Sequence, residues 1–401
     1  MKTNYNRKLY KNTPQGTKDL LFEECTARKY IEDKLERIFT LRGYNRVMTP
    51  GIEYMDLFSV GNTGINAEEM YKFSDLNGRL LALRADATLP IARVASTRLQ
   101  NLTDPKRLYY FHKIYRNNPS FLGKRNEMMQ AGIEVLGIGG VKNDLEILIT
   151  AFETLNACSR DFRIEISYAG LFKTLIEQLK ATDEEKEEIR LLIESKNYGS
   201  LNSILDELEE SNITKAIKLL PRLFGSEEVF EQAYKICPDY KFKSQLDYLK
   251  KIYIILKESG YANGLIVDLG LVHRNDYYSG IVFSGYISGV ADSVLKGGRY
   301  DKLAASFGMS KPAIGFGVDV DALAMLALEN NEINTDDDTV LIHCDNGYEI
   351  NMIYYAEMLH GRGIRCEYSI FSTLDEAKEY AKKKNMKKIY YAKENIEEII
   401  L

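Results

Sequence analysis

The 401-residue chain lacks long uncharged apolar runs, paired cysteines and an excess of positive charge. No apolar stretch approaches the roughly 20 residues that a membrane helix needs. The segment MKTNYNRKLYKNTPQGT has no apolar core, so we expect no secretory signal peptide. The five cysteines are odd in number, scattered and free of CxxC spacing. They predict reduced thiols in a cytoplasmic protein with no membrane partner.

The formal net charge of −5 gives no indication of a nucleic-acid-binding surface, although a local basic patch can lie on an acidic protein. His343, Cys344, His360 and Cys366 gather near the C-terminus. Adjacent residues of a strand point to opposite faces, so His343 and Cys344 do not easily share one metal ion. We therefore expect no metal site there.

Composition shifts predict three parts. Residues 1–330 form the expected core, and within it 171–262 carries charged amphipathic runs that predict a helical insertion. The polar residues 331–337 predict a linker. Residues 338–401 alternate strands and helices, which predicts a small α/β domain of three strands. This last part holds 9 Lys and Arg against 11 Asp and Glu. A domain that grips RNA would more often be basic.

The pattern of apolar residues predicts the elements around the site. We expect helices at 23–42, 88–97, 142–156 and 320–330, and strands at 44–50, 79–84, 162–168, 264–272, 277–287 and 313–318. Residues 107–137 predict strand, loop and strand. The second of these strands alternates strictly and places Gln130, Gly132 and Glu134 on its polar face. That face fits an ordinary half-solvated strand or the floor of a polar small-molecule pocket.

Three further segments bear on this choice. LRADAT places Asp86 and Thr88 at a strand-to-helix junction, where they act either as a helix cap or as acceptors for a ligand's ammonium group. DYYSG and GGRYD are each expected to precede a strand. Paired tyrosines are more often core residues than ligand contacts. The two glycines before Arg299 allow close backbone approach to a bound molecule.

Taken in order, these segments resemble histidyl-tRNA synthetase and its paralogues. The resemblance includes TPQGTKDL, QAGIE, GLVHRNDYYSGIVF, GGRYD and IGFGV, and it extends over essentially the whole chain. It implies an α+β fold: a class II aminoacyl-tRNA synthetase-like antiparallel sheet flanked by helices, with a helical insertion and a small C-terminal α/β domain that looks like a truncated anticodon-binding domain. It also implies a homodimer built largely on the helix at 23–42 and the strand that ends at Pro50.

The resemblance implies a histidine pocket with no cofactor. Its residues would be Asp86, Thr88, Arg116, Gln130, Glu134, Tyr277 and Tyr278. Asp86 and Thr88 match the contacts of the α-ammonium group, and Gln130 matches the amide near the α-amino and carboxylate groups. Glu134 and Tyr278 match the pair that reads the imidazole nitrogens, with Tyr277 alongside. A ligand without those nitrogens would leave both groups unpaired.

Four positions depart from the pattern of an active synthetase. Asn118 replaces an acidic residue that helps to place the adenine, and His273 replaces an arginine. Ala322 replaces a second arginine, in a stretch where Asp319 also replaces a glycine. Losing a cation that stabilises phosphoryl charge commonly costs factors of about 10³–10⁵ in rate. The departures predict that activation of an amino acid by ATP is lost.

A site that keeps amino-acid contacts and loses nucleotide contacts is similar to one paralogous branch, the regulatory subunits of ATP phosphoribosyltransferase in histidine biosynthesis. The resemblance implies a non-catalytic partner of the short-form catalytic subunit, in a hetero-oligomer, that binds L-histidine and transmits feedback inhibition. The carboxylate of histidine would then need a cation from Arg274, Arg299 or the partner. Two alternatives stay open: a divergent but active synthetase, and a synthetase-like RNA sensor or accessory protein.

Overall fold

The structure, a computed structural model, describes residues 9–60, 65–100, 104–118, 124–272, 277–308, 311–333 and 338–401. The chain divides into two compact units, Met1–Ile333 and Asn334–Leu401. The predicted linker at 331–337 spans this division, and residues 334–337 lie outside the described part of the chain.

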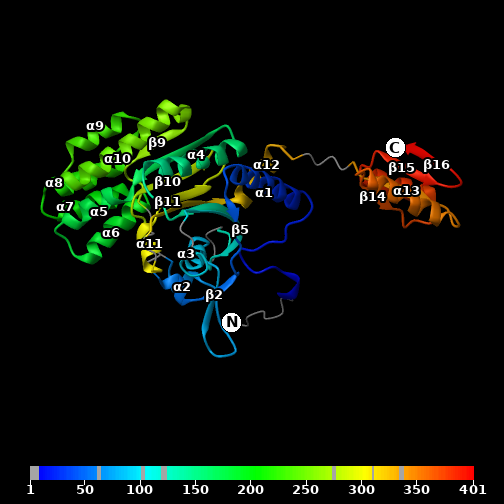
Figure 1. The fold of residues 1–401 in the computed structure, drawn as a ribbon, viewed down its shortest axis with the longest axis horizontal. Helices are drawn as coiled ribbons and strands as arrows, with labels where there is room; N and C mark the ends of the chain where they lie inside the picture. The colour runs from blue at the N-terminus through cyan, green and yellow to red at the C-terminus, as the bar shows by residue number, and fades with distance from the viewer. Residues whose placement is uncertain are drawn as a thin grey trace, which may run out of the picture. The chain divides into compact units, whose positions relative to one another are not determined.

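A nine-stranded sheet forms the centre of the first unit (Figure 1). Its strand order is β1-β5-β6-β12-β11-β10-β7-β9-β8. The strands are β1 (Asn45–Arg46), β5 (Lys106–Tyr115), β6 (Glu127–Leu136), β7 (Phe162–Tyr168), β8 (Phe224–Gly225), β9 (Leu265–Asp268), β10 (Ile281–Ile287), β11 (Leu295–Arg299) and β12 (Ala313–Asp319). Neighbours are antiparallel except for the parallel pairs β1–β5 and β7–β9. The predicted fold class is confirmed.

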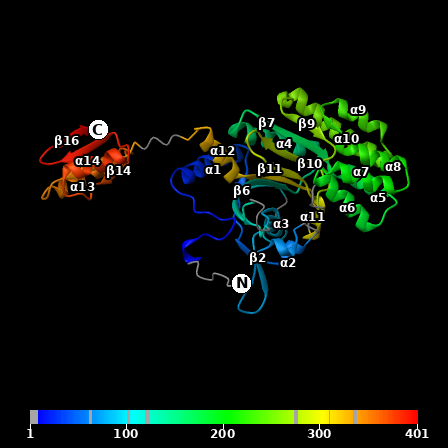
Figure 2. The same cartoon turned by 180° about the vertical axis from the view of Figure 1, so that it is seen from behind.

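One face of this sheet is covered by α1 (Glu23–Leu41), α4 (Val141–Cys158) and α12 (Val320–Glu329). In α1 the fully buried residues recur every four positions, at Ala27, Ile31, Leu35 and Phe39, and so form one stripe on the helix. Figures 1 and 2 show α1 and α12 side by side against the sheet. The alternating residues Ala131, Ile133 and Val135 of β6 point into this same core.

The opposite face carries a second apolar cluster under α3 (Thr88–Thr97) and α11 (Asp301–Ser306). Beside them lies a three-stranded sheet of order β2-β4-β3, with β2 (Ile52–Tyr54), β3 (Lys72–Ser74) and β4 (Leu80–Leu83). Short helical turns occur at α2 (Asp56–Ser59), Leu9–Lys11, Ala67–Glu69 and Leu220–Arg222. Because Tyr110, Tyr277 and Tyr300 belong to this second cluster, polar hydroxyls are built into its core.

The segment from 169 to 261 is mainly helical and gathers at one end of the sheet (Figures 1 and 2). Its helices are α5 (Ala169–Gln178), α6 (Asp183–Glu194), α7 (Tyr198–Glu207), α8 (Asn212–Leu219), α9 (Glu228–Lys235) and α10 (Tyr240–Leu256), followed by a π-helical turn at Lys257–Tyr261. Thr182 and Glu185 close a capping box that starts α6. The segment also contributes β8, which pairs with β9 at the sheet edge.

The second unit is a small α/β domain with strand order β14-β13-β15-β16. Its elements are β13 (Val340–Cys344), α13 (Glu349–Gly361), β14 (Cys366–Tyr368), α14 (Leu374–Lys383), β15 (Lys388–Ala392) and β16 (Ile396–Ile400). The prediction of three strands is wrong. The acidic stretch 396–400 forms a fourth strand because it pairs antiparallel with β15 at the edge, where its glutamates stay solvated.

Two local predictions also need correction. The strand expected at 44–50 is only β1, because the chain leaves the sheet after the bond from Val47 N to Tyr109 O. GGRYD does not precede a strand. Its glycines and Arg299 end β11, and Asp301 begins α11. Among the described residues, no helix is both long and apolar enough to cross a membrane.

A core substitution tests this packing. The ring of Phe39 is fully buried, 5.9 Å from that of Tyr109 and 6.2 Å from that of Phe316. Phe39→Ala should lower the free energy of unfolding by about 3–5 kcal/mol, since it leaves a cavity where α1 meets the sheet. Urea denaturation followed by circular dichroism measures this. Arg37→Ala, at an exposed position of the same helix, is the control and should change little. Equal effects of the two substitutions would contradict the proposed packing.

Candidate functional site

The register of three strands builds one polar face. Glu134 of β6 lies directly across from Gly315 of β12, and Gly132 lies across from Gly317. On the other side of β6, Gly132 lies across from Tyr110 of β5. Residues directly opposite each other in an antiparallel pair point to the same face. This face therefore carries a tyrosine and a glutamate above a floor of glycines.

The glycines are required by close contacts. A Cβ on Gly315 would overlap the carboxylate of Glu134, and a Cβ on Gly317 would lie 2.7 Å from Nε2 of Gln130. On β11, a Cβ on Gly298 would lie 2.8 Å from the ring of Tyr278. The side chains of Glu134, Gln130 and Tyr278 thus lie directly over these glycines. Glycine is needed there because any larger residue would displace these three polar side chains.

Glu134 is the most buried charged group of this face, with 1% of its surface exposed. The Thr88 hydroxyl donates a hydrogen bond to Oε1 at 2.8 Å, and the Tyr300 hydroxyl donates one to Oε2 at 2.6 Å. Burial raises the pKa of Glu134 to about 8, although both hydrogen bonds act in the opposite direction. The site thus holds a carboxyl group that ionises near neutral pH and that a cationic ligand would favour as the anion.

Asp86 fills the capping role that its sequence position allowed. Its Oδ1 accepts a hydrogen bond from Leu89 N at 3.0 Å and so caps the start of α3. Burial raises its pKa, whereas the backbone bonds from Leu89 and Thr88 and the charge of Arg116 lower it. A contact between this carboxylate and a ligand's ammonium group stays a prediction. The capping bond also fixes the first turn of α3, which begins with Thr88.

Gln130 and two tyrosines complete this end of the face. The Tyr110 hydroxyl donates to Oε1 of Gln130 at 3.1 Å, which leaves the amide Nε2 as a donor above Gly317. The ring centroids of Tyr277 and Tyr278 lie 4.8 Å apart. Burial raises the pKa of both phenols, so both stay protonated at neutral pH. The structure therefore brings together six of the seven predicted residues.

Arg116, the seventh, lies just beyond β5. Its Nη1 is 3.9 Å from a carboxylate oxygen of Glu69, and its charge acts on Asp86. Arg299, named as a possible cation for the ligand, is committed elsewhere. It pairs with Asp144, and at 3.2 Å with Asp301. It follows Gly298 in β11 and so points to the opposite face of the sheet.

Two of the residues predicted to have lost nucleotide contacts make hydrogen bonds within the protein instead. The Asn118 amide donates to Arg125 O at 2.9 Å. Ala322 lies in the first turn of α12, where its N–H donates to Oδ1 of Asp319 at 3.0 Å. His273 and Arg274 lie outside the described residues.

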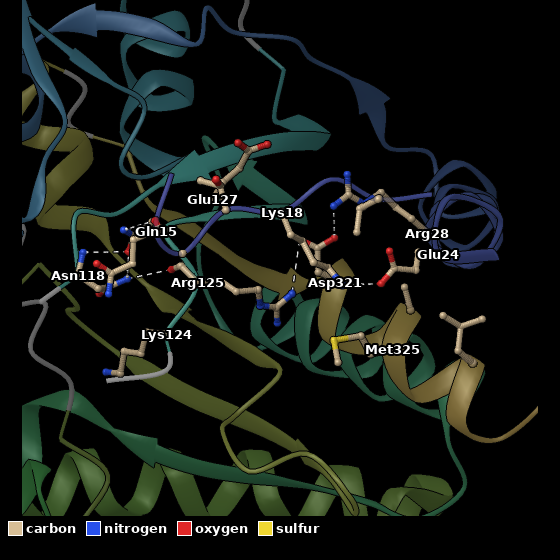
Figure 3. Close-up of a pocket in the computed structure, with 16 residues that line it drawn as sticks. Gln15, Lys18, Glu24, Arg28, Asn118, Lys124, Arg125, Glu127, Asp321 and Met325 are labelled. Carbon is tan, nitrogen blue, oxygen red and sulfur yellow. Dashed lines mark hydrogen bonds and ion pairs between the residues drawn. The ribbon is translucent and has the colours of Figure 1, made fainter. Parts of the chain in front are cut away.

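A cavity of about 460 Å³ opens next to this region, between the segment from Gln15 to Arg28, Asn118, residues 124–127 and α12 (Figure 3). Two arginines near it are neutralised. Arg125 pairs with Asp319 at 2.9 Å and with Asp321 at 3.5 Å, and Arg28 pairs with Asp321 at 2.5 Å. Asp321 also accepts a bond from Met129 N at 2.8 Å. The two aspartates neutralise the arginines, whose positive charge a bound polyphosphate would need.

Sequence reasoning missed Tyr300 and Tyr110. Tyr300 stands inside GGRYD, and its sequence position gives no sign that its hydroxyl reaches Glu134. Tyr110 alternates with Leu108 and His112 on β5, and this alternation places it on the polar face only through the register with β6. Within the described ranges, no group of three or more His, Cys, Asp or Glu side chains could hold a metal ion.

Comparison with known proteins agrees with this geometry. Residues 16–323 match the histidyl-tRNA synthetase family. An ATP phosphoribosyltransferase regulatory subunit of Clostridium kluyveri is 40% identical over 94% of this chain and 98% of its own length. A solved structure from Bacillus halodurans, titled an ATP phosphoribosyltransferase regulatory subunit/histidyl-tRNA synthetase, is 27% identical with a TM-score of 0.83 and covers 95% of this chain and 97% of its own.

The chain belongs to the ATP phosphoribosyltransferase regulatory subunits of the histidyl-tRNA synthetase family.

The predicted family is thereby confirmed. A histidyl-tRNA synthetase from Nostoc sp. PCC 7120 shares the fold, with a TM-score of 0.79 over 97% of this chain and 96% of its own at 18% identity. Regulatory subunits and synthetases therefore share one scaffold, and the side chains of the site must account for any difference in function.

The buried carboxyl group predicts a pH dependence of stability. The folded protein keeps the proton of Glu134 up to about pH 8, whereas the unfolded chain releases it near its usual value of 4.5. Between these values the folded state binds more protons, so this group's contribution to stability falls as the pH rises. Glu134→Gln should reduce the slope of unfolding free energy against pH by up to about 1.4 kcal/mol per pH unit.

Urea denaturation at pH 5, 6, 7 and 8 measures that slope. Tyr300→Phe serves as the second variant, because it removes a hydrogen bond that lowers the pKa of Glu134. This variant should extend to higher pH the range over which the free energy of unfolding falls. Identical slopes for the wild-type protein and Glu134→Gln would show that Glu134 is ionised in the folded state.

Proposed function

We propose that this chain is the non-catalytic regulatory subunit of an ATP phosphoribosyltransferase. The complete enzyme catalyses the first step of histidine biosynthesis, and this subunit activates its short-form catalytic subunit and mediates feedback inhibition by L-histidine. The histidine would bind at Asp86, Thr88, Arg116, Gln130, Glu134, Tyr277 and Tyr278. One observation carries the proposal: the end of the site that fits an amino acid is complete, whereas the arginines near the nucleotide end are paired with aspartates.

The amino-acid end suits a small cationic ligand with ring nitrogens. Asp86 and Glu134 supply two carboxylates, and Tyr278 supplies a phenol that stays protonated. A histidine ligand would satisfy these groups through its ammonium and imidazole nitrogens. A ligand without the ring would leave a buried carboxyl group and a phenol unpaired, at a cost of about 1–3 kcal/mol for each group.

The nucleotide end does not suit ATP. Preorganised cations stabilise the charge that develops during phosphoryl and nucleotidyl transfer. Here Arg125 and Arg28 already share Asp319 and Asp321, and Ala322 offers no charge. A polyphosphate would also meet the two carboxylates. This arrangement supports a binding subunit rather than an aminoacylating enzyme.

The regulatory action follows from linkage. Histidine inhibits a complex only if it binds one conformational state more tightly than another. The capped turn of α3 joins Asp86 and Thr88 to Glu134, so a ligand that contacts these residues acts on α3 and β6 together. The proposal includes a cytoplasmic hetero-oligomer without nucleic acid as a partner.

A homodimer within that hetero-oligomer is part of the proposal. Several large apolar side chains are exposed around the end of α1 and the small sheet: Leu41, Met48, Ile52, Tyr54 and Leu80. Exposed apolar patches of this kind mark protein–protein contact sites. A two-fold symmetric interface would pair this patch with its copy.

Reconstitution tests the proposed function. The purified chain, added to a short-form catalytic subunit, should raise its rate of phosphoribosyl-ATP formation, and L-histidine should inhibit the complex. Glu134→Gln should weaken inhibition by histidine about 10-fold or more, since it removes the carboxyl group that a cationic ligand would hold as the anion. Glu153→Gln, which changes a carboxylate on α4 paired with Arg42, is the matched control and should keep wild-type inhibition. A chain that leaves the catalytic subunit unaffected would overturn the proposal.

A second assay separates this proposal from an active synthetase. Histidine-dependent exchange between ATP and pyrophosphate should be at background with the purified chain, because the required cations are paired or absent among the described residues. A histidyl-tRNA synthetase of established activity is the positive control. Clear exchange would mean that the chain activates histidine and would restore the synthetase hypothesis.

A further inference from the structure

The bound amino acid also has a carboxylate, and most cations near the site are already in use. Arg84 donates to the backbone oxygens of Thr49, Pro50 and Lys113. Arg125 pairs with Asp319, and Arg299 points to the other face of the sheet, where it pairs with Asp144. Arg116 lies 3.9 Å from a carboxylate oxygen of Glu69, and its charge acts on Asp86. A carboxylate held next to Gln130 would therefore gain from a further positive charge.

Lys296 stands on the correct face of the sheet. In β11 it lies directly across from Gly317 of β12, which lies across from Gly132 of β6. Cross-strand partners share a face, so the side chain of Lys296 projects on the same side as Gln130 and Glu134. The one register position between Lys296 and β6 is Gly317 of β12, and the Gln130 amide and the Tyr110 hydroxyl lie over it. Gly317 itself has no side chain to separate the lysine from Gln130.

The distance between Lys296 and Gln130 suits a carboxylate. Nε2 of Gln130 lies 2.7 Å from the place of a Cβ on Gly317. Opposite Cβ atoms in an antiparallel pair are about 4.5–5.5 Å apart. The lysine stem therefore starts about one strand spacing from the Gln130 amide. A carboxylate placed above Gly317 would accept from Nε2 of Gln130 on one side and from the ammonium of Lys296 on the other.

The surroundings of Lys296 favour an anion. The side chain is exposed and makes no hydrogen bond or ion pair with the described residues. Desolvation lowers the pKa of its ammonium group, the charges of Asp292 and Glu194 raise it, and those of Lys124 and Arg116, which are weaker, lower it. None of these charges forms an ion pair with Lys296 among the described residues, so a ligand carboxylate would stabilise the cation.

We propose that Lys296 is a specificity-determining residue that pairs with the α-carboxylate of the bound amino acid. It would supply positive charge for the carboxylate of the ligand and would distinguish an amino acid from the corresponding amine or alcohol. This inference rests on the proposed binding of histidine. It adds a residue of β11 to a site otherwise formed by β6, the start of α3 and the tyrosine pair.

The test compares two ligands that differ only at the carboxylate. Isothermal titration of the full chain with L-histidine and with L-histidinol, whose carboxylate is replaced by a hydroxymethyl group, isolates this contact. Lys296→Met should weaken L-histidine binding about 10- to 100-fold, the usual value of a charge-assisted hydrogen bond, and should leave L-histidinol affinity within about twofold. Lys296→Arg should restore most of the preference for histidine. Lys251→Met removes an exposed lysine on α10 and is the matched control.

The outcomes separate the two proposals. If the wild-type chain binds histidine and Lys296→Met binds it equally well, the role of Lys296 is overturned while histidine binding stands. If Lys296→Met weakens both ligands equally, the lysine acts on the fold of the site and does not pair with the carboxylate. If the wild-type chain binds no histidine, either alone or with the catalytic subunit, the proposed ligand and the role of Lys296 are both overturned. Thermal unfolding by circular dichroism verifies that each variant folds.

Discussion

The buried carboxyl group of Glu134 constrains much of the structure around it. A carboxylate removed from water is costly unless hydrogen bonds compensate for the loss. Two hydroxyls do so, one from Thr88 at the start of α3 and one from Tyr300 at the end of β11. Gly315 must lack a side chain, because a Cβ would overlap the carboxylate. Strand β6, strand β12, helix α3 and the turn into α11 are thus fixed relative to one another by one polar group.

The two ends of the site differ in the sign of the charge that they leave available. At the proposed amino-acid end, burial raises the pKa values of Asp86 and Glu134 in a space lined with tyrosines, so a cationic ligand would favour both groups as anions. At the nucleotide end, Asp319 and Asp321 take up the positive charge of Arg125 and Arg28. Enzymes that transfer phosphoryl or nucleotidyl groups need free, preorganised cations. A scaffold shared with synthetases is therefore consistent with a ligand-binding subunit, and the difference lies in a few charges.

Local patterns in the sequence predicted most of the elements, because each helix and strand repeats its apolar residues with its own period. The alternation at 127–137 placed Gln130 and Glu134 on one face before any partner was known. GGRYD and strand β16 were misjudged, since a strand end and an edge strand depend on which neighbours pair with them. The bonds from Tyr300 to Glu134 and from Arg125 to Asp319 join residues 166 and 194 positions apart, and no local pattern signals them.

The sequence by itself determined the family, the order of elements and the side chains that share a face of each strand, because motif identity and periodicity are local properties. It also determined that Ala322 stands where an active synthetase carries an arginine. Only the tertiary structure decided which carboxylate meets which hydroxyl, which arginines are neutralised and that Lys296 faces Gln130 across a glycine. These contacts depend on strand register and on the packing of distant segments, which the whole fold sets at once.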